Sequence, residues 1–181
     1  MKGTGNPQII IYTGDGKGKT SAAMGQMLRA IGHGGKCAVA QFVKGDPAKL
    51  DCGEWKAACR LGVLWKDFGS GFTWEGDNKE TNKMLCLQGW EQAKRWISSG
   101  DFDMLVLDEF TYAFTLGYLD VGNVAQWLDD HHGKKGFPSL VISGRGCPQE
   151  LVAIADIVSE IKEIKHSFSK NGRKPLPMIE F

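Results

Sequence analysis

Apolar residues in this chain form short runs that alternate with segments of helical spacing. The first run, residues 8–12 (QIIIY), is rich in β-branched residues and leads directly into a glycine-rich segment. Such a run is typical of a buried parallel strand. After the glycines, two apolar series recur at i, i+4 and i+7 until the segment GHGG: Ala23, Met27, Ala30 and Met24, Leu28, Ile31. The pattern therefore predicts a strand, a loop and a helix that ends at glycines.

The rest of the chain continues this alternation. Apolar runs predict strands at residues 37–42, 63–68, 104–107, 140–143 and 157–164. Helical faces are marked by Cys86, Trp90, Ala93 and Ile97, then by Val121, Val124 and Leu128, and Pro148 opens a third helix. Strands that alternate with helices predict an α/β fold, with a mostly parallel sheet covered by helices on both faces. Residues 44–54 and 69–78 fit no element, and we expect them to be loops beside the carboxyl ends of strands, where such sheets bind ligands.

Length and charge narrow the class of protein. The 181 residues predict a single domain over residues 1–181. Lys and Arg number 22 against 21 Asp and Glu, so a net charge of +1 gives no reason to expect nucleic acid or a membrane as partner. We expect a cytoplasmic protein, because the chain shows no apolar signal-peptide core and no stretch near the roughly 18 apolar residues of a membrane span. The five cysteines, without a C-x-x-C pair, favour neither a disulfide framework nor a zinc site.

The glycine-rich segment, residues 13–20 (TGDGKGKT), resembles a phosphate-binding loop with an altered count. The common pattern G-x-x-x-x-G-K-[ST] would place a glycine where Thr13 stands. Glycines let backbone N–H groups turn toward an anion, while Lys19 would reach phosphate oxygens and the Thr20 hydroxyl would coordinate Mg²⁺. The segment therefore predicts an ATP site. The expected ATP-binding residues of the loop are Thr13, Gly14, Asp15, Gly16, Lys17, Gly18, Lys19 and Thr20.

Two further strand ends carry charged residues. The strand at residues 104–107 runs into Asp108 and Glu109, which are hard oxygen ligands for Mg²⁺ at the same sheet edge as the loop. The strand at residues 140–143 runs into Gly144-Arg145-Gly146, which predicts that Arg145 contacts the triphosphate. The structural alternatives are an ordinary glycine turn, a solvated acidic turn and a surface arginine. In combination with the loop, the motifs predict ATP and Mg²⁺ but not the reaction.

Eight motifs in this order carry a family resemblance: TGDGKGKTSAA, RAIGHG, QFVKG, GFTWE, VLDEFTY, ISGRGCP, ADIVSEI and KHSF. The chain resembles the ATP:corrinoid adenosyltransferase family, which has a RecA-like P-loop fold. The resemblance implies transfer of the 5′-deoxyadenosyl group of ATP to cobalt(I) of a corrinoid, with release of triphosphate. It also implies Mg²⁺, a homodimer, a flavoprotein-type reductase as partner and ATP binding by Arg29 in RAIGHG.

The GFTWE motif contributes Phe72 and Trp74, which point the same way in an extended backbone. One reading is that two aromatic rings anchor a loop to the core. The family resemblance implies instead a catalytic role, in which Phe72 and Trp74 face the corrinoid and exclude an axial ligand from cobalt(II). Two other functions remain open from the residues alone. A phosphotransferase or NTPase would release ADP, and a nucleotide-sensing module would bind ATP without turnover.

Overall fold

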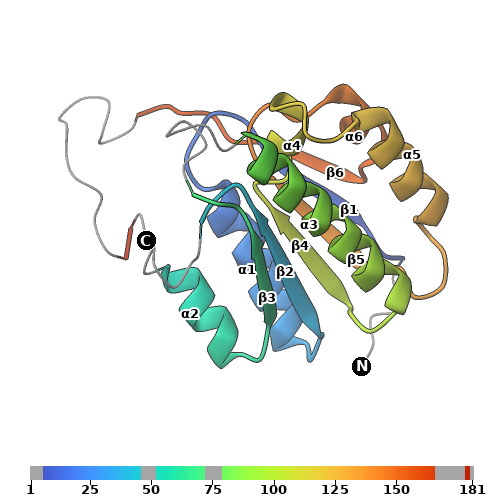
Figure 1. The fold of residues 1–181 in the computed structure, drawn as a ribbon. Coiled ribbons are helices and arrows are strands. Elements are labelled where there is room, and N and C mark those ends of the chain that lie inside the picture. The colour runs from blue at the N-terminus through green and yellow to red at the C-terminus, as the bar shows by residue number, and fades with distance from the viewer. Residues whose placement is uncertain (1–5, 46–51, 72–78, 166–177, 180–181) are drawn as a thin grey trace.

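A sheet of six parallel strands forms the centre of the protein (Figure 1). The structure is a computed structural model, and it describes residues 6–45, 52–71, 79–165 and 178–179. The strands lie in the order β3-β2-β4-β5-β1-β6. They are β1 (Ile9–Thr13), β2 (Cys37–Phe42), β3 (Leu64–Phe68), β4 (Met104–Asp108), β5 (Ser139–Ser143) and β6 (Ile157–Glu160). The helices are α1 (Lys19–Gly32), α2 (Gly53–Arg60), α3 (Lys79–Ser99), α4 (Tyr112–Thr115), α5 (Val121–His131) and α6 (Gln149–Ile154).

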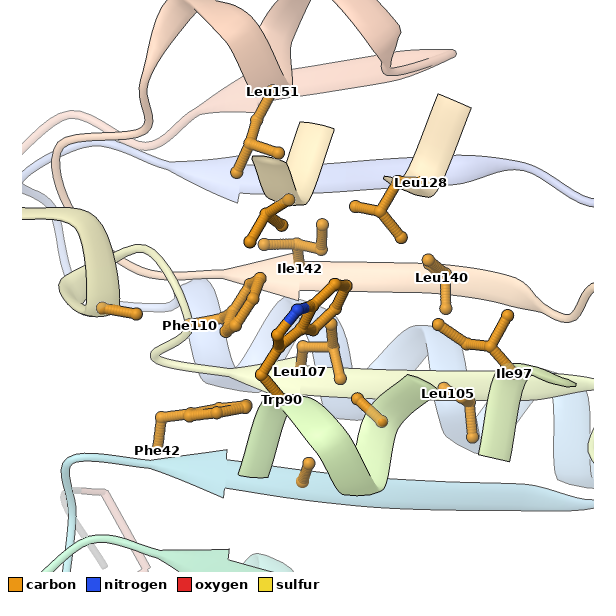
Figure 2. Close-up of a cluster of buried hydrophobic side chains, with 14 of the residues drawn as sticks. Phe42, Trp90, Ile97, Leu105, Leu107, Phe110, Leu128, Leu140, Ile142 and Leu151 are labelled. Atoms are coloured by element: carbon orange, nitrogen blue, oxygen red, sulfur yellow. The ribbon is translucent and has the colours of Figure 1, made fainter. Parts of the chain in front are cut away.

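The helices cover both faces of the sheet and create two apolar clusters. Along β4, Leu105 and Leu107 enter the cluster under α3, α5 and α6, whereas Met104 and Val106 enter the cluster under α1. This alternation follows from the two-residue period of a strand. Figure 2 shows the larger cluster, in which Trp90 of α3 lies among apolar side chains of several strands. The predicted α/β fold with a parallel sheet is therefore confirmed.

The predicted strands agree with the structure except at the end of the last one. The sheet part of that strand ends at Glu160, not at residue 164. Beyond Glu160, the N–H of Ile161 still donates to the Thr13 carbonyl at 2.8 Å, but the Ile161 carbonyl accepts from Gly16 of the glycine loop. The chain therefore leaves the sheet to lie over this loop.

Two helices were not predicted. Helix α2 has eight residues and a single buried side chain, Ala58, so it offers no periodic apolar stripe to read. Helix α4 is a single turn of four residues that begins three positions after Glu109. Among the helices that the structure describes, none is long and apolar enough to cross a membrane.

Parallel strands bring three predicted motifs to one edge. The sheet order places β5 between β4 and β1, so the acidic pair, the GRG turn and the glycine loop follow three neighbouring strands. Strand β2 lies on the other side of β4 and ends at Phe42. The carboxyl edge of these four strands is therefore where a ligand site is expected.

Candidate active site

The glycine loop joins β1 to α1, as the sequence predicted. Gly14 and Gly18 have φ values of 99° and 118°, in the region that disfavours any side chain. Gly18 caps the start of α1, and its carbonyl accepts the N–H of Ala22 at 2.8 Å. The loop thus delivers the chain to the N-terminus of a 14-residue helix, whose free N–H groups and dipole favour an anion.

Lys19 is folded into the loop. Its side chain is buried, with 7% of the residue exposed, and Nζ donates to the Gly16 carbonyl at 2.6 Å. Burial lowers the pKa of Lys19, and the positive charge of Arg145 lowers it further. The charges of Glu109 and Asp15 raise the pKa but do not outweigh these effects, and a triphosphate in the loop would add further counter-charge to this buried ammonium.

The segment after β6 gives the loop glycines a second role. The N–H of Gly16 donates to the Ile161 carbonyl at 2.8 Å. A Cβ on Gly16 would lie 2.7 Å from the carbonyl carbon of Lys162, and one on Gly14 would lie 2.5 Å from the Ile161 oxygen. Because Gly14 and Gly16 have no side chains, the backbone of residues 161–162 can pack against the loop. The local sequence pattern did not predict this contact.

We expect Gly16→Ala to lower the free energy of unfolding by about 1–3 kcal/mol, the usual cost of overpacking, because the new methyl group would collide with rigid backbone. Thermal or urea denaturation measures the change. Gly25→Ala is a matched control, since Gly25 lies in α1 with nothing within 4 Å of its added Cβ. That variant should gain about 0.5–1 kcal/mol from helix propensity. Equal stability of the two variants would contradict the close packing of residues 161–162.

Asp108 is fully buried at the end of β4, and both of its carboxylate oxygens accept hydrogen bonds. Ser143 Oγ donates to Oδ1 at 2.6 Å, and Gln41 Nε2 donates to Oδ2 at 3.0 Å. Burial alone would raise the pKa of Asp108, but the nearby Lys44 ammonium and these hydrogen bonds outweigh it and lower the pKa. These partners therefore favour the charged form of Asp108 beneath the site.

Glu109 differs from its neighbour in strain and in bonding. Its φ of 58° is in the left-handed region, and its N–H donates to Ser143 Oγ at 3.1 Å. The atom Oε2 is buried without a hydrogen-bond partner in the described part of the chain. Burial raises the pKa of Glu109, and the charge of Asp108 raises it further. A strained residue with an unsatisfied buried oxygen fits a ligand of a cation.

Lys44 lies in the QFVKG motif, but the sequence did not predict that it belongs to the site. Its Nζ lies 3.4 Å from Thr20 Oγ1, 3.4 Å from Asp108 Oδ2 and 3.6 Å from Glu109 Oε1. The three residues predicted to serve Mg²⁺ thus converge on one position, and a lysine ammonium lies there. One signal could have identified it: Lys44 follows the end of a buried strand within two residues, at the sheet edge that binds ligands.

The residues at this position fit Mg²⁺. One hydroxyl and two carboxylates converge there, and Glu109 Oε2 has no partner among the described residues. Within the described ranges, no three His, Cys, Asp or Glu side chains group closely enough to hold a metal by themselves. This composition suits Mg²⁺, which commonly takes one or two carboxylates and completes its shell with substrate phosphates and water.

The GRG turn lies beside the loop because β5 pairs with β1, and the N–H of Gly144 donates to the Tyr12 carbonyl at 3.2 Å. The Thr13 hydroxyl, at the position where the common motif has glycine, accepts the N–H of Cys147 at 3.3 Å. Arg145 is exposed between Gly144 and Gly146, and its charge acts on Lys19. The threonine therefore ties the loop to the segment that carries this arginine.

The structure does not place the remaining three predicted site residues at the glycine loop. Arg29 lies in the last turn of α1, where its Nη1 donates to Gln26 at 3.0 Å. It is ten residues beyond Lys19, about 15 Å along the helix axis, so the structure does not bring it to the loop. Its ATP-binding role stays a prediction. Phe72 and Trp74 lie outside the described residues.

A cavity of about 570 Å³ lies at the other end of the sheet, lined by Pro7, His132 and Asp156 among others. These residues precede β1 and β6 or follow α5, so the cavity is at the amino ends of the strands. It is therefore separate from the glycine loop and the acidic pair.

Comparisons with known proteins bear on the identity of the site. Residues 5–181 match the family model described as ATP:corrinoid adenosyltransferase BtuR/CobO/CobP. The corrinoid adenosyltransferase of Escherichia coli is 39% identical over 160 residues, which cover 88% of this chain and 79% of that protein. Corrinoid adenosyltransferase CobA of Salmonella typhimurium shows the same identity and coverage. The Pseudomonas aeruginosa corrinoid adenosyltransferase is 34% identical over 175 residues, or 96% of this chain and 83% of that protein. This chain belongs to the ATP:corrinoid adenosyltransferase family.

Proposed function

We propose that this protein transfers the 5′-deoxyadenosyl group of ATP to cobalt(I) of a corrinoid and releases triphosphate, in the synthesis or salvage of adenosylcobalamin. Family membership over residues 5–181 is the observation that carries the proposal. The strand, glycine loop and helix, with Lys19 buried inside the loop, support it independently as an anion site.

The chemistry explains what the site must do. A cobalt–carbon bond forms with an electron pair of cobalt(I), and the bond between C5′ and its phosphate oxygen breaks, so triphosphate leaves with the electron pair of the broken C–O bond. Negative charge therefore grows on the leaving group in the transition state, where fixed cations and N–H donors are most effective. Lys19, Arg145 and Lys44 are cations at this site, and α1 offers its N-terminal N–H groups.

Thr20 and Glu109 are the residues we assign to Mg²⁺, with Asp108 as the fixed charge behind them. Bound Mg²⁺ would neutralise part of the charge on the triphosphate. Thr20 is the second residue of α1 and Glu109 follows β4, so two rigid elements position the pair.

The test is incubation with ATP, MgCl₂ and cobalamin reduced chemically to cobalt(I), followed through the visible spectrum. We expect a photolabile adenosylated product whose amount depends on the enzyme. ATP bound without any change in the corrinoid spectrum would favour the nucleotide-sensing module instead.

Phe72 and Trp74 are proposed to exclude an axial ligand from cobalt(II), which would ease its reduction. We expect the double variant Phe72→Ala/Trp74→Ala to lose activity when a protein reductase must reduce cobalt(II). The same variant should keep much of its activity with chemically supplied cobalt(I), because the triphosphate site is unchanged. Equal losses in both assays with a lower melting temperature would assign the two rings to loop anchoring.

The flavoprotein-type reductase, the homodimer and the cytoplasmic location stay predictions. They come from the family resemblance and the sequence. Sedimentation equilibrium of the purified protein measures the dimer directly, and a monomer at micromolar concentration would contradict it.

A further inference from the structure

We propose that Lys44 is a positioning residue and an internal cation: in the nucleotide-free protein its ammonium occupies the divalent metal position, so the metal binds only together with ATP. The inference rests on the magnesium site of the proposed function. It assigns a role to a residue that lies in the QFVKG motif but is not among the expected site residues.

The contacts of the ammonium support this role. Lys44 Nζ lies within 3.6 Å of an oxygen from Thr20, Asp108 and Glu109, the three residues assigned to the metal and its support. These contacts pair one ammonium with two adjacent carboxylates that would otherwise repel each other.

The backbone directs Lys44 to this position at a conformational cost. The N–H of Lys44 donates to the Phe42 carbonyl at 2.7 Å, which closes a three-residue turn around Val43. Val43 has a φ of 68°, and a β-branched residue in the left-handed region is a genuine outlier. Strain of this kind persists where the surrounding structure imposes it, and it is concentrated at functional sites.

The end of β3 makes room for this turn. A Cβ on Gly69 would lie 2.1 Å from the Lys44 carbonyl oxygen and 2.3 Å from the Val43 carbonyl carbon. Only a residue without a side chain admits the turn at this distance. The strained residue and the glycine together show that the placement of Lys44 is built into the fold.

Charge then explains why metal binding should require ATP. A divalent ion bound at about 2.1 Å from the oxygens cannot share the position with an ammonium that lies within 3.6 Å of the same oxygens. ATP brings several negative charges into the loop beside the ammonium. The lysine would then pair with phosphate, and Thr20 and Glu109 would be free to hold the divalent ion.

The experiment measures Mn²⁺, a paramagnetic substitute for Mg²⁺, by the loss of the free-ion EPR signal on binding. We expect the wild-type protein without nucleotide to bind Mn²⁺ weakly. Lys44→Met should bind it about ten- to a hundredfold more tightly, the range expected when one charge-assisted contact competes for the ligands. Lys44→Gln is the second neutral variant, and it keeps polar character should the methionine variant not fold.

Two control variants make the result specific. Lys44→Arg keeps the positive charge and should exclude Mn²⁺ as the wild type does. Lys94→Met removes a lysine on α3 whose Nζ pairs with Glu91 at 2.7 Å, and it should leave Mn²⁺ binding unchanged. A merely structural lysine would not give this pattern, because Lys44→Arg and Lys44→Met would then differ in stability and not in nucleotide-free Mn²⁺ affinity.

Equal Mn²⁺ affinity of the wild type and the neutral variants without ATP, whether strong or weak, overturns the proposal. So does an arginine variant that behaves like Lys44→Met. The magnesium site itself is tested separately by adding ATP to the wild type: absence of ATP-dependent Mn²⁺ binding would reject that site, and absence of an adenosylated corrinoid would reject the function.

Discussion

Replacing Lys19 with alanine is expected to slow adenosyl transfer by about ten- to a hundredfold, the cost of losing one charge-assisted contact to a charged group. The ammonium is buried inside the glycine loop, where a phosphate oxygen would meet it, and water cannot easily replace it. The loss should appear in kcat/KM for ATP, measured from the visible spectrum of the corrinoid product with chemically reduced cobalt(I).

The protein should remain folded in this variant. Lys19 Nζ makes one described hydrogen bond, to Gly16, and burial disfavours its charge, as its lowered pKa shows. Removal of the side chain therefore also removes a desolvation cost. Lys94→Ala, at an ion pair on α3 far along the chain from the loop, is the control and should retain full activity. Turnover near that of the wild type in Lys19→Ala would reject the phosphate-loop assignment.

Substitutions of Glu109 and Asp108 should have different effects, the first on Mg²⁺ dependence and the second on stability. We expect Glu109→Gln to raise the Mg²⁺ concentration for half-maximal transfer by about tenfold or more, because the amide keeps the shape and loses the charge. Its thermal stability should be unchanged or higher. Burial raises the pKa of Glu109 and Oε2 has no partner, so the charge costs stability in the nucleotide-free protein.

Asp108→Asn should instead lower the free energy of unfolding by about 1–3 kcal/mol, the cost of leaving a buried donor unpaired. Both oxygens of Asp108 accept from donors, so an amide nitrogen would either face the Gln41 amide donor to donor or leave the Ser143 hydroxyl proton without its acceptor. Denaturation of both variants measures the change in stability, and Mg²⁺ titration of both measures the change in Mg²⁺ dependence. Loss of stability in Glu109→Gln with an unchanged Mg²⁺ titration would return Glu109 to a purely structural role.

Much of the sheet could be predicted because its signal is local. Each buried strand is a short β-branched or aliphatic run, and β2 over residues 37–42 was predicted at its observed bounds. The motifs at the strand ends followed from the same rule, because parallel strands bring their carboxyl ends to one edge. The loop, Asp108, Glu109 and Arg145 thus converged as expected.

The remaining features depend on contacts between distant parts of the chain. Ile161 lies over Gly16 although 145 positions separate them, so the early end of β6 and the second role of the loop glycines are not visible in either segment alone. Lys44 reaches the acidic pair through a strained turn at Val43. Sequence patterns favour common backbone conformations, so a β-branched residue at positive φ cannot be predicted from them.

The central claim is that the triphosphate of ATP leaves intact while C5′ is transferred. The most direct measurement is the phosphorus NMR spectrum of a reaction with ATP, Mg²⁺ and cobalt(I) cobalamin, compared with the amount of adenosylated corrinoid from the visible spectrum. We predict one equivalent of triphosphate per adenosylated corrinoid, with no ADP. Formation of ADP, with no cobalt–carbon product, would contradict the account and identify a phosphotransferase or NTPase.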